Sequence, residues 1–474
     1  MQHLAHRARP ISTSMFPQSA PTGFPLTQGN ERKAESIQAH VFCTLPVELQ
    51  IEIFSMCAPS IPKIGEDTAP ALLCRVCRAW RCVIAGTPRF WSTFLVEICT
   101  DSELRERLPT NDRPNLLPIV ALWLDRSKNH FLDITLRNVP WTLGDVDLKI
   151  LQLLWGCADR WRNVDFDIIH SNFQFMATTL PSSLPKVLPC LERLALRLKG
   201  PIQTDLRLKS NIPWHQISYL DILCSAAPLM TLDEFWDVLL QAQRLRSCSI
   251  NLDCSFQQSI FRKIHTGELT VPSLNTLKMV LQCRTSSNLQ EYLLTFLNHL
   301  DLPDLHTLEL SWRFGDRETD PWQAERFTLL PFVQTISSHL RDLTLGYLPL
   351  NDTHLRECLA QLPHLTRLEL CYSMLDTEED YITYELLEAL TPSSSDDVVL
   401  PCLHSLFLSS RGTKYNDSIL LKLIDSRRDK SSGAAMLQIL HVLRMNSVEE
   451  ELRKRVDVWR EEGMAITIEN LRLL

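Results

Sequence analysis

Apolar residues recur along most of the chain in the pattern U-x-x-U-x-U, where U is an apolar residue and x is any residue. The last two apolar positions are two residues apart, which is the spacing of a strand with one buried face. The units are Phe131/Ile134/Leu136, Trp161/Val164/Phe166, Leu191/Leu194/Leu196, Ile217/Leu220/Ile222, Leu245/Cys248/Ile250, Leu274/Leu277/Met279, Leu305/Leu308/Leu310, Leu340/Leu343/Leu345, Leu365/Leu368/Leu370 and Leu403/Leu406/Leu408. Consecutive units begin between 25 residues apart (Leu340 to Leu365) and 38 residues apart (Leu365 to Leu403). The pattern therefore predicts an irregular repeat of strands.

The residues around these strands predict turns and helices. Several units open with a leucine followed by proline, as in LPDLHTLEL at Leu302 and LPHLTRLEL at Leu362, and this proline predicts a turn into the strand. Segments 232–242, 289–300 and 353–362 carry apolar residues at helical spacing. Stacked strand–turn–helix units favour an α/β solenoid with parallel strands inside the curve and helices outside. A compact α/β domain built from the same units is the alternative.

A different pattern occupies the N-terminal part of the chain. Leu45, Leu49 and Ile53 recur at intervals of four residues, which predicts a helix that begins near Pro46. A second helix is predicted from Pro70 to Gly86, where glycine favours a helix end. A helical module of about 50 residues has little internal core, so it is expected to complete that core on a partner.

Two segments of this module resemble the sequence of a known protein family. LPVELQIEIF and APALLCRVCRAWRCVIAGTPRFW, between Cys43 and about Phe94, resemble the F-box of fungal F-box proteins, especially the mushroom-type pattern LPxEL, VCRxW and TPxxW. The resemblance implies a three-helix module that binds the Skp adaptor and, through it, a cullin-based ubiquitin ligase. The adaptor-binding residues that it implies are Leu45, Pro46, Leu49, Ile53, Phe54, Val76 and Trp80. The link between the helices is longer than in the general family, and an ordinary helical hairpin is the alternative.

The strand units resemble the leucine-rich repeats found behind many F-boxes, although the usual Asn or Cys after the L-x-L element is mostly missing. The expected fold is therefore α/β, with an N-terminal three-helix F-box followed by an irregular leucine-rich-repeat solenoid. The expected divisions are a disordered tail (1–40), the F-box (41–94), a helical connector (95–130) and the solenoid (131–474).

The polar residues that flank the buried pair of each strand are expected on the concave surface. The candidate substrate-binding residues are Asp165, Asp167, Arg197, Tyr219, Asp221, Glu309 and Arg367. Mixed charges favour a polar protein partner over a polyanion. For each single residue, a solvated sheet face without a ligand is an equal alternative.

Composition narrows the function classes. The net charge of −8 gives no overall attraction to a phosphate backbone, so no nucleic-acid partner is expected. The 13 glycines are too few to favour a nucleotide-binding doubly wound fold. No apolar run approaches the roughly 20 residues of a spanning helix, so no membrane partner is expected. The 15 cysteines are spread along the chain, which favours reduced thiols and a cytoplasmic or nuclear location.

No local motif singles out a catalytic, cofactor-binding or metal-binding site. Cys74 and Cys77 have C-x-x-C spacing, but no second pair of ligands accompanies them, so core cysteines are favoured. The expected function is a non-catalytic substrate receptor that binds the Skp adaptor through the F-box and a protein substrate of unknown identity through the repeats. The alternatives are a non-degradative interaction scaffold and an unrecognised hydrolase, which requires a pocket where Cys or His meets a carboxylate.

Overall fold

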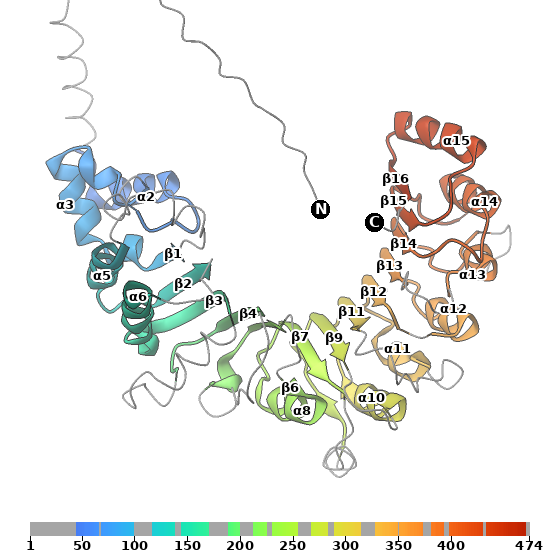
Figure 1. Cartoon of the computed structure of the whole chain (residues 1–474), viewed down its shortest axis with the longest axis horizontal. Coiled ribbons are helices and arrows are strands. Elements are labelled where there is room, and N and C mark those ends of the chain that lie inside the picture. The colour runs from blue at the N-terminus through green and yellow to red at the C-terminus, as the bar shows by residue number, and fades with distance from the viewer. Residues whose placement is uncertain are drawn as a thin grey trace, which may run out of the picture.

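The computed structural model describes residues 44–65, 68–98, 116–137, 144–169, 188–199, 212–224, 230–254, 267–282, 289–313, 328–348, 350–372, 381–392, 398–429 and 433–470. These residues form an open arc, with strands on the inside and helices on the outside (Figure 1). The predicted tail, residues 1–40, lies outside the described residues.

One parallel sheet of 14 strands runs through the whole arc. Its strands follow one another almost in chain order, because each neighbouring pair is joined by an intervening unit rather than by a hairpin. The strands are β1 (Thr93–Glu97), β2 (Leu132–Arg137), β3 (Trp161–Ile169), β4 (Arg193–Lys199), β5 (Tyr219–Cys224), β6 (Met230–Thr231), β7 (Ser247–Asp253), β9 (Thr276–Gln282), β11 (Thr307–Trp312), β12 (Asp342–Gly346), β13 (Arg367–Cys371), β14 (Ser405–Ser409), β15 (Ile439–Arg444) and β16 (Ala465–Asn470). The short strands β8 (Leu269–Thr270) and β10 (Leu300–Asp301) pair with each other.

The described residues include eleven α-helices and several short 3-10 helices. The α-helices are α2 (Val47–Cys57), α3 (Arg78–Gly86), α5 (Leu116–Ser127), α6 (Asp145–Trp155), α8 (Leu232–Gln241), α10 (Leu289–Asn298), α11 (Leu330–Ile336), α12 (Asp352–Ala360), α13 (Tyr384–Ala389), α14 (Asp417–Arg428) and α15 (Glu450–Glu461). The 3-10 helices are η1 (Leu73–Arg75), η2 (Pro88–Trp91), η3 (Ala158–Arg160) and η5 (Trp214–Gln216). Helices α8, α10 and α12 confirm the three helical segments predicted between strands. Helix α8 begins with a capping box, in which Thr231 and Glu234 each bond the other's backbone N–H.

The strand register explains the apolar repeat. The second apolar residues of successive units lie side by side across the sheet and are all buried; with the strands outside the predicted units they are Phe94, Ile134, Val164, Leu194, Leu220, Cys248, Leu277, Leu308, Leu343, Leu368, Leu406, Leu440 and Ile466. The third apolar residues form a parallel buried row two residues further along. Both rows point toward the outer helices, which gives a solenoid-like α/β fold rather than a compact α/β domain.

Two details of the predicted repeat differ from the structure. The side chain of Phe131 is 52% exposed, and the neighbouring Leu132 occupies the buried position at the start of β2. The sheet also extends beyond the ten predicted units, through β1 at one end and β15 and β16 at the other. Strands β1 and β15 carry buried apolar pairs of their own, and β16 carries the buried Ile466 and the half-buried Ile468, but no leucine–proline phrase precedes these strands.

The N-terminal module also departs from prediction in its second helix. The segment from Pro70 to Gly86 is not one helix, because Cys77 adopts an extended backbone and divides it into turns with η1 and the separate helix α3. The Cys77 thiol accepts a bond from the backbone N–H of Trp80, so Cys77 caps α3. The connector predicted as helical over residues 95–130 includes most of strand β1 and then, among its described residues, helix α5.

The module is attached to the first strand of the sheet. The backbone N–H of Leu95 bonds the carbonyl of Pro62 at 2.8 Å, and the N–H of Ile64 bonds the carbonyl of Leu95 at 2.9 Å. The indole of Trp91 packs edge-on against that of Trp123 in α5, with ring centroids 5.2 Å apart. These contacts fix the module at one end of the arc.

Candidate interaction surfaces

Helix α2 turns one face into the module and another toward solvent. Gln50 and Phe54 form the inner face, and the Phe54 ring packs edge-on against Trp80 with centroids 4.8 Å apart. The amide of Gln50 donates to the carbonyl of Leu45 at 2.8 Å, which satisfies its polar group at the edge of the core. Helices α2 and α3 therefore meet through an aromatic pair.

Several large apolar side chains of this module remain exposed. Leu49 is 52% exposed and Val76 is 58% exposed, so neither is used in the internal packing. The exposed apolar set, as we name it, consists of Val47, Leu49, Met56, Ile61, Leu72 and Val76. Single exposed apolar residues are ordinary on protein surfaces, so the set supplies candidate contact residues. Leu49 and Met56 share one face of α2, whereas Val47 lies on another.

The seven predicted adaptor-binding residues divide into three groups. Pro46, Leu49 and Val76 are exposed, whereas Leu45, Ile53 and Trp80 are half-buried. Phe54 is 1% exposed and packs in the core of the module, and its predicted contact with an adaptor stays a prediction. The resemblance that implied these contacts could not separate the groups, because it does not report how far each side chain is buried in this chain.

Sequence reasoning omitted four members of the exposed apolar set: Val47, Met56, Ile61 and Leu72. Met56 follows Leu49 by seven residues, which places the two on the same helical face. That spacing could have identified Met56. Ile61 and Leu72 lie in turns, where no periodic signal exists.

Five of the predicted substrate-binding residues lie together on the inner face, by which we mean the strand side chains that point away from the helices. The Asp165 carboxylate on β3 receives bonds from Arg137 on β2 at 2.5 and 3.0 Å and from Arg197 on β4 at 3.1 Å. Arg197 also donates to Asp221 on β5 at 2.8 Å. The other Asp221 oxygen is buried without a hydrogen-bond partner among the described residues. The result is a chain of alternating charges across four strands.

The other two of these five predicted residues, Asp167 and Tyr219, make contacts beside this row of alternating charges. Asp167 pairs with Lys199 at 2.9 Å. The Arg193 guanidinium lies over the Tyr219 ring, 4.4 Å from its centroid. Burial, with a further contribution from the Asp221 carboxylate, raises the pKa of the Tyr219 phenol, which therefore stays neutral at physiological pH.

Glu309 and Arg367 do not join this cluster. They lie on β11 and β13, and strands β7 and β9 separate Glu309 from Asp221. Each is paired locally, Glu309 with Lys278 at 3.0 Å and Arg367 with Glu369 at 2.9 Å. The seven predicted residues therefore share one face but not one site.

A second group of paired side chains lies beside these residues, and the sequence had placed only its Asn163 on the concave surface. Asp133 on β2 receives bonds from Arg162 at 2.6 Å and Asn163 at 2.7 Å, both on β3. Like Arg137, these residues lie on strands that the repeat pattern located correctly. Their pairing depends on strand register, which a sequence pattern does not give.

The far part of the inner face adds aromatic side chains to the Arg367–Glu369 pair on β13. Phe407 on β14 packs edge-on against His441 on β15, with ring centroids 4.5 Å apart. Ile439 beside them is 49% exposed, and Tyr347 just after β12 is 41% exposed. This part supplies exposed aromatic and aliphatic surface that could anchor a partner.

Burial keeps several thiols of the described residues protonated at neutral pH. Burial raises the pKa of Cys358 to about 12, and burial together with Glu369 raises the pKa of Cys371 to about 12. Cys77 serves as a helix cap, and burial raises the pKa of Cys74. No group of three or more metal-ligating side chains occurs in the part of the chain that the structure describes.

Comparison with known proteins adds no relative. No protein-family model matches the chain, and no curated protein matches it significantly. None of the helices within the described ranges is long and apolar enough to cross a membrane.

Proposed function

We propose that this protein is a non-catalytic substrate receptor of a Skp/cullin/F-box ubiquitin ligase. In this proposal the N-terminal module is an F-box that binds the Skp adaptor. The strand–turn–helix units are irregular leucine-rich repeats whose inner face holds a target protein.

The observation that carries the proposal is the exposed apolar set on the module. Fully burying one large aliphatic side chain contributes roughly 1.5–3 kcal/mol, so a partner that covered several of them would gain substantial affinity. Leu49 and Val76 belong both to the predicted contacts and to the exposed apolar set. The module stands at one end of the arc, which leaves the inner face open for a second partner (Figure 1).

The charged side chains of the inner face would contribute more to the choice of target than to the affinity for it. These charges are already paired with one another, as between Arg197 and Asp221, so a ligand gains little from any single one. A target that placed like charges against these side chains would be repelled, which is unfavourable by several kcal/mol. The exposed aromatic part around Phe407 offers the apolar contact area that the charged part lacks.

Ubiquitin transfer in such a complex needs no reactive residue from this chain. Holding a target lysine near the charged conjugating enzyme raises its effective concentration, which accelerates the reaction by proximity alone. The raised pKa values of the buried thiols accord with this passive role.

Co-expression with a Skp adaptor and purification of the complex test the proposal. The variant Val76→Glu places a charge in the exposed apolar set and is expected to weaken adaptor binding at least about tenfold without unfolding the module. Leu240→Glu on α8 is the matched control, because Leu240 is 51% exposed and lies on an outer helix away from the module.

Two results would count against the proposal. Absence of adaptor binding by the intact chain would remove its basis, and equal loss of binding in Val76→Glu and Leu240→Glu would indicate a general folding defect instead. Adaptor binding without cullin in the purified complex would favour the non-degradative scaffold.

A further inference from the structure

The two ends of the large sheet have different outer edges. At the first end, the extended segment Pro62–Ile64 adds to β1 through the two backbone bonds of Leu95. Ile64 is 5% exposed there, and Lys63 forms an ion pair with Glu97. An extended segment of a few residues, with one buried aliphatic side chain and one ion pair, therefore suffices to cover a terminal strand of this sheet.

At the other end, β16 pairs with β15 and with no other strand of the described chain. In a parallel strand, alternate residues direct both backbone groups to the same side. Ala465 bonds toward β15, since its N–H donates to the carbonyl of Gln438 at 2.9 Å. The backbone groups of Ile466 and Ile468 therefore point outward. Arg460 bonds the Ile466 carbonyl, so the N–H groups of both residues and the carbonyl of Ile468 are the groups to which a further strand would bind.

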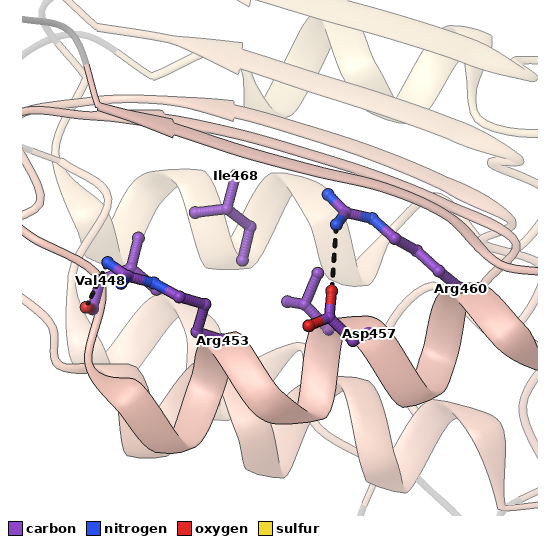
Figure 2. Close-up of a pocket in the computed structure, with 6 residues that line it drawn as sticks. Val448, Arg453, Asp457, Arg460 and Ile468 are labelled. Atoms are coloured by element: carbon purple, nitrogen blue, oxygen red, sulfur yellow. Dashed lines mark hydrogen bonds and ion pairs between the residues drawn. The ribbon is translucent and has the colours of Figure 1, made fainter.

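A groove of about 260 Å³ lies beside this outer edge, between α15 and β16. Its lining residues are Val448, Arg453, Val456, Asp457, Arg460 and Ile468. Figure 2 shows Ile468 between Arg453 on one side and Arg460 on the other. The floor is aliphatic because Val448, Val456 and Ile468 line it.

The charges around the groove are unequal. Arg460 donates to the outward carbonyl of Ile466 at 3.1 Å and pairs with Asp457 at 3.3 Å. Arg453 donates to the carbonyl of Val448 at 3.4 Å, and its nearest carboxylate, Glu450, is 3.9 Å away. Two guanidinium groups thus face one carboxylate within the groove lining, which favours an acidic ligand.

We propose that the outer edge of β16 and this groove bind an extended acidic segment of another protein as an added strand. The segment has the pattern acidic–x–aliphatic–x–acidic. Its aliphatic side chain enters the groove over Ile468, and its two carboxylates pair with Arg453 and Arg460. The two arginines are about 10 Å apart along the helix, and side chains four residues apart on a strand are about 13 Å apart, so flexible glutamates can reach both.

A second copy of this chain fits the same edge less well. Antiparallel pairing of two β16 strands would bring the two α15 helices side by side, with Arg453 of each near Arg460 of the other. Like charges at that contact are unfavourable. The surface is distinct from the module and from the inner face, so the inference stands apart from the proposed function.

Fluorescence anisotropy with the full chain tests this inference. The probes are labelled synthetic peptides containing Glu-Thr-Val-Thr-Glu or Lys-Thr-Val-Thr-Lys, each with a photo-crosslinking group at the valine position. The glutamate peptide is expected to bind at least about tenfold more tightly at low salt and to crosslink within α15 or β16. Arg453→Glu is expected to abolish that preference. Lys454→Glu, an equal charge change at an exposed position outside the groove, is expected to preserve it.

Ile468→Pro removes an outward N–H without removing any bond to β15, so it is expected to weaken binding, whereas Ile468→Val is expected to retain it. Equal affinity for both peptides, crosslinks elsewhere, or unchanged binding by Ile468→Pro would overturn the inference. So would a dimer that this substitution dissociates, or glutamate-peptide binding that appears only after residues 471–474 are deleted.

Discussion

The N-terminal module exposes apolar side chains, whereas the C-terminal unit of the arc, from α14 to β16, buries charged ones. The module leaves apolar residues exposed, with Leu49 and Val76 each more than half accessible to solvent. The C-terminal unit buries charged residues, with Arg427 at 0% and Arg444 at 2% exposure. The difference lies in whether these groups find their partners within the chain.

The buried charges of the C-terminal unit are paired within the chain, although the Arg444 Nε is buried without a hydrogen-bond partner among the described residues. Arg427 donates to the carbonyls of Leu390, Val399 and Leu400 at distances between 2.7 and 3.0 Å. Burial lowers the pKa of Arg427 to about 10, so the guanidinium is still charged at neutral pH and needs these acceptors.

Arg444 and Asp417 form a second buried group. They make an ion pair, and the Asp417 carboxylate also accepts a bond from the backbone N–H of Glu449 at 2.7 Å. This arrangement ties β15 to the start of α14 and to the segment that leads into α15. The comparison indicates that the C-terminal unit is complete by itself in this respect, whereas the surface of the module is suited to an external partner.

The largest effect is expected for Arg444→Ala. Removing this guanidinium leaves the Asp417 carboxylate buried without its counter-charge, which typically costs about 3–5 kcal/mol. Hydrogen exchange should therefore show strong loss of protection in β14–β16 and no change in α2 and α3. Lys422→Ala removes an exposed pair with Glu388 and should change protection by less than about 1 kcal/mol, and a similar response in both variants would contradict the distinction.

An intermediate effect is expected for Trp80→Ala. The lost aromatic pair with Phe54 and the lost buried area together correspond to about 2 kcal/mol. Hydrogen exchange of α2 and α3 measures this loss, and Trp80→Phe, which keeps an aromatic ring, should retain most of the protection. Unchanged protection in Trp80→Ala would mean that the ring is not part of the core of the module.

The smallest effect on stability is expected for Leu49→Ala. An exposed side chain contributes little to folding, so protection in the module should change by no more than about 0.5 kcal/mol. Adaptor affinity should nevertheless fall measurably in the same variant. A loss of stability above about 1 kcal/mol would indicate that Leu49 packs within the module. That result would contradict the statement that the module leaves this side chain exposed.

Much of the arc could be predicted from the sequence because burial on one face of a strand imposes a spacing of two. Leu308 and Leu310 illustrate this, since both are buried and in register with both neighbouring strands. The first residue of the first unit was wrong because Phe131 and Leu132 are both apolar and only packing chooses between them. Strand β15 was missed although Leu437, Leu440 and Val442 have the same spacing as the predicted units, so its sequence signal was present and was overlooked.

The candidate surfaces were less predictable than the fold. Leu49 and Phe54 on α2 were both predicted to contact the adaptor, yet Leu49 is exposed and Phe54 is buried. The division of the predicted helix at Cys77 depends on local backbone geometry that helical spacing does not report.

The sequence by itself determined the alternation of strands and helices and the two buried rows, because those follow from local spacing and hydrophobic burial. Only the tertiary structure decided which charges meet on the inner face, as Asp165 meets Arg137 and Arg197, and which apolar side chains stay exposed on the module. The physical reason is that strand register and helix packing bring together residues that lie about 30 positions apart, and no local pattern encodes which of them will touch.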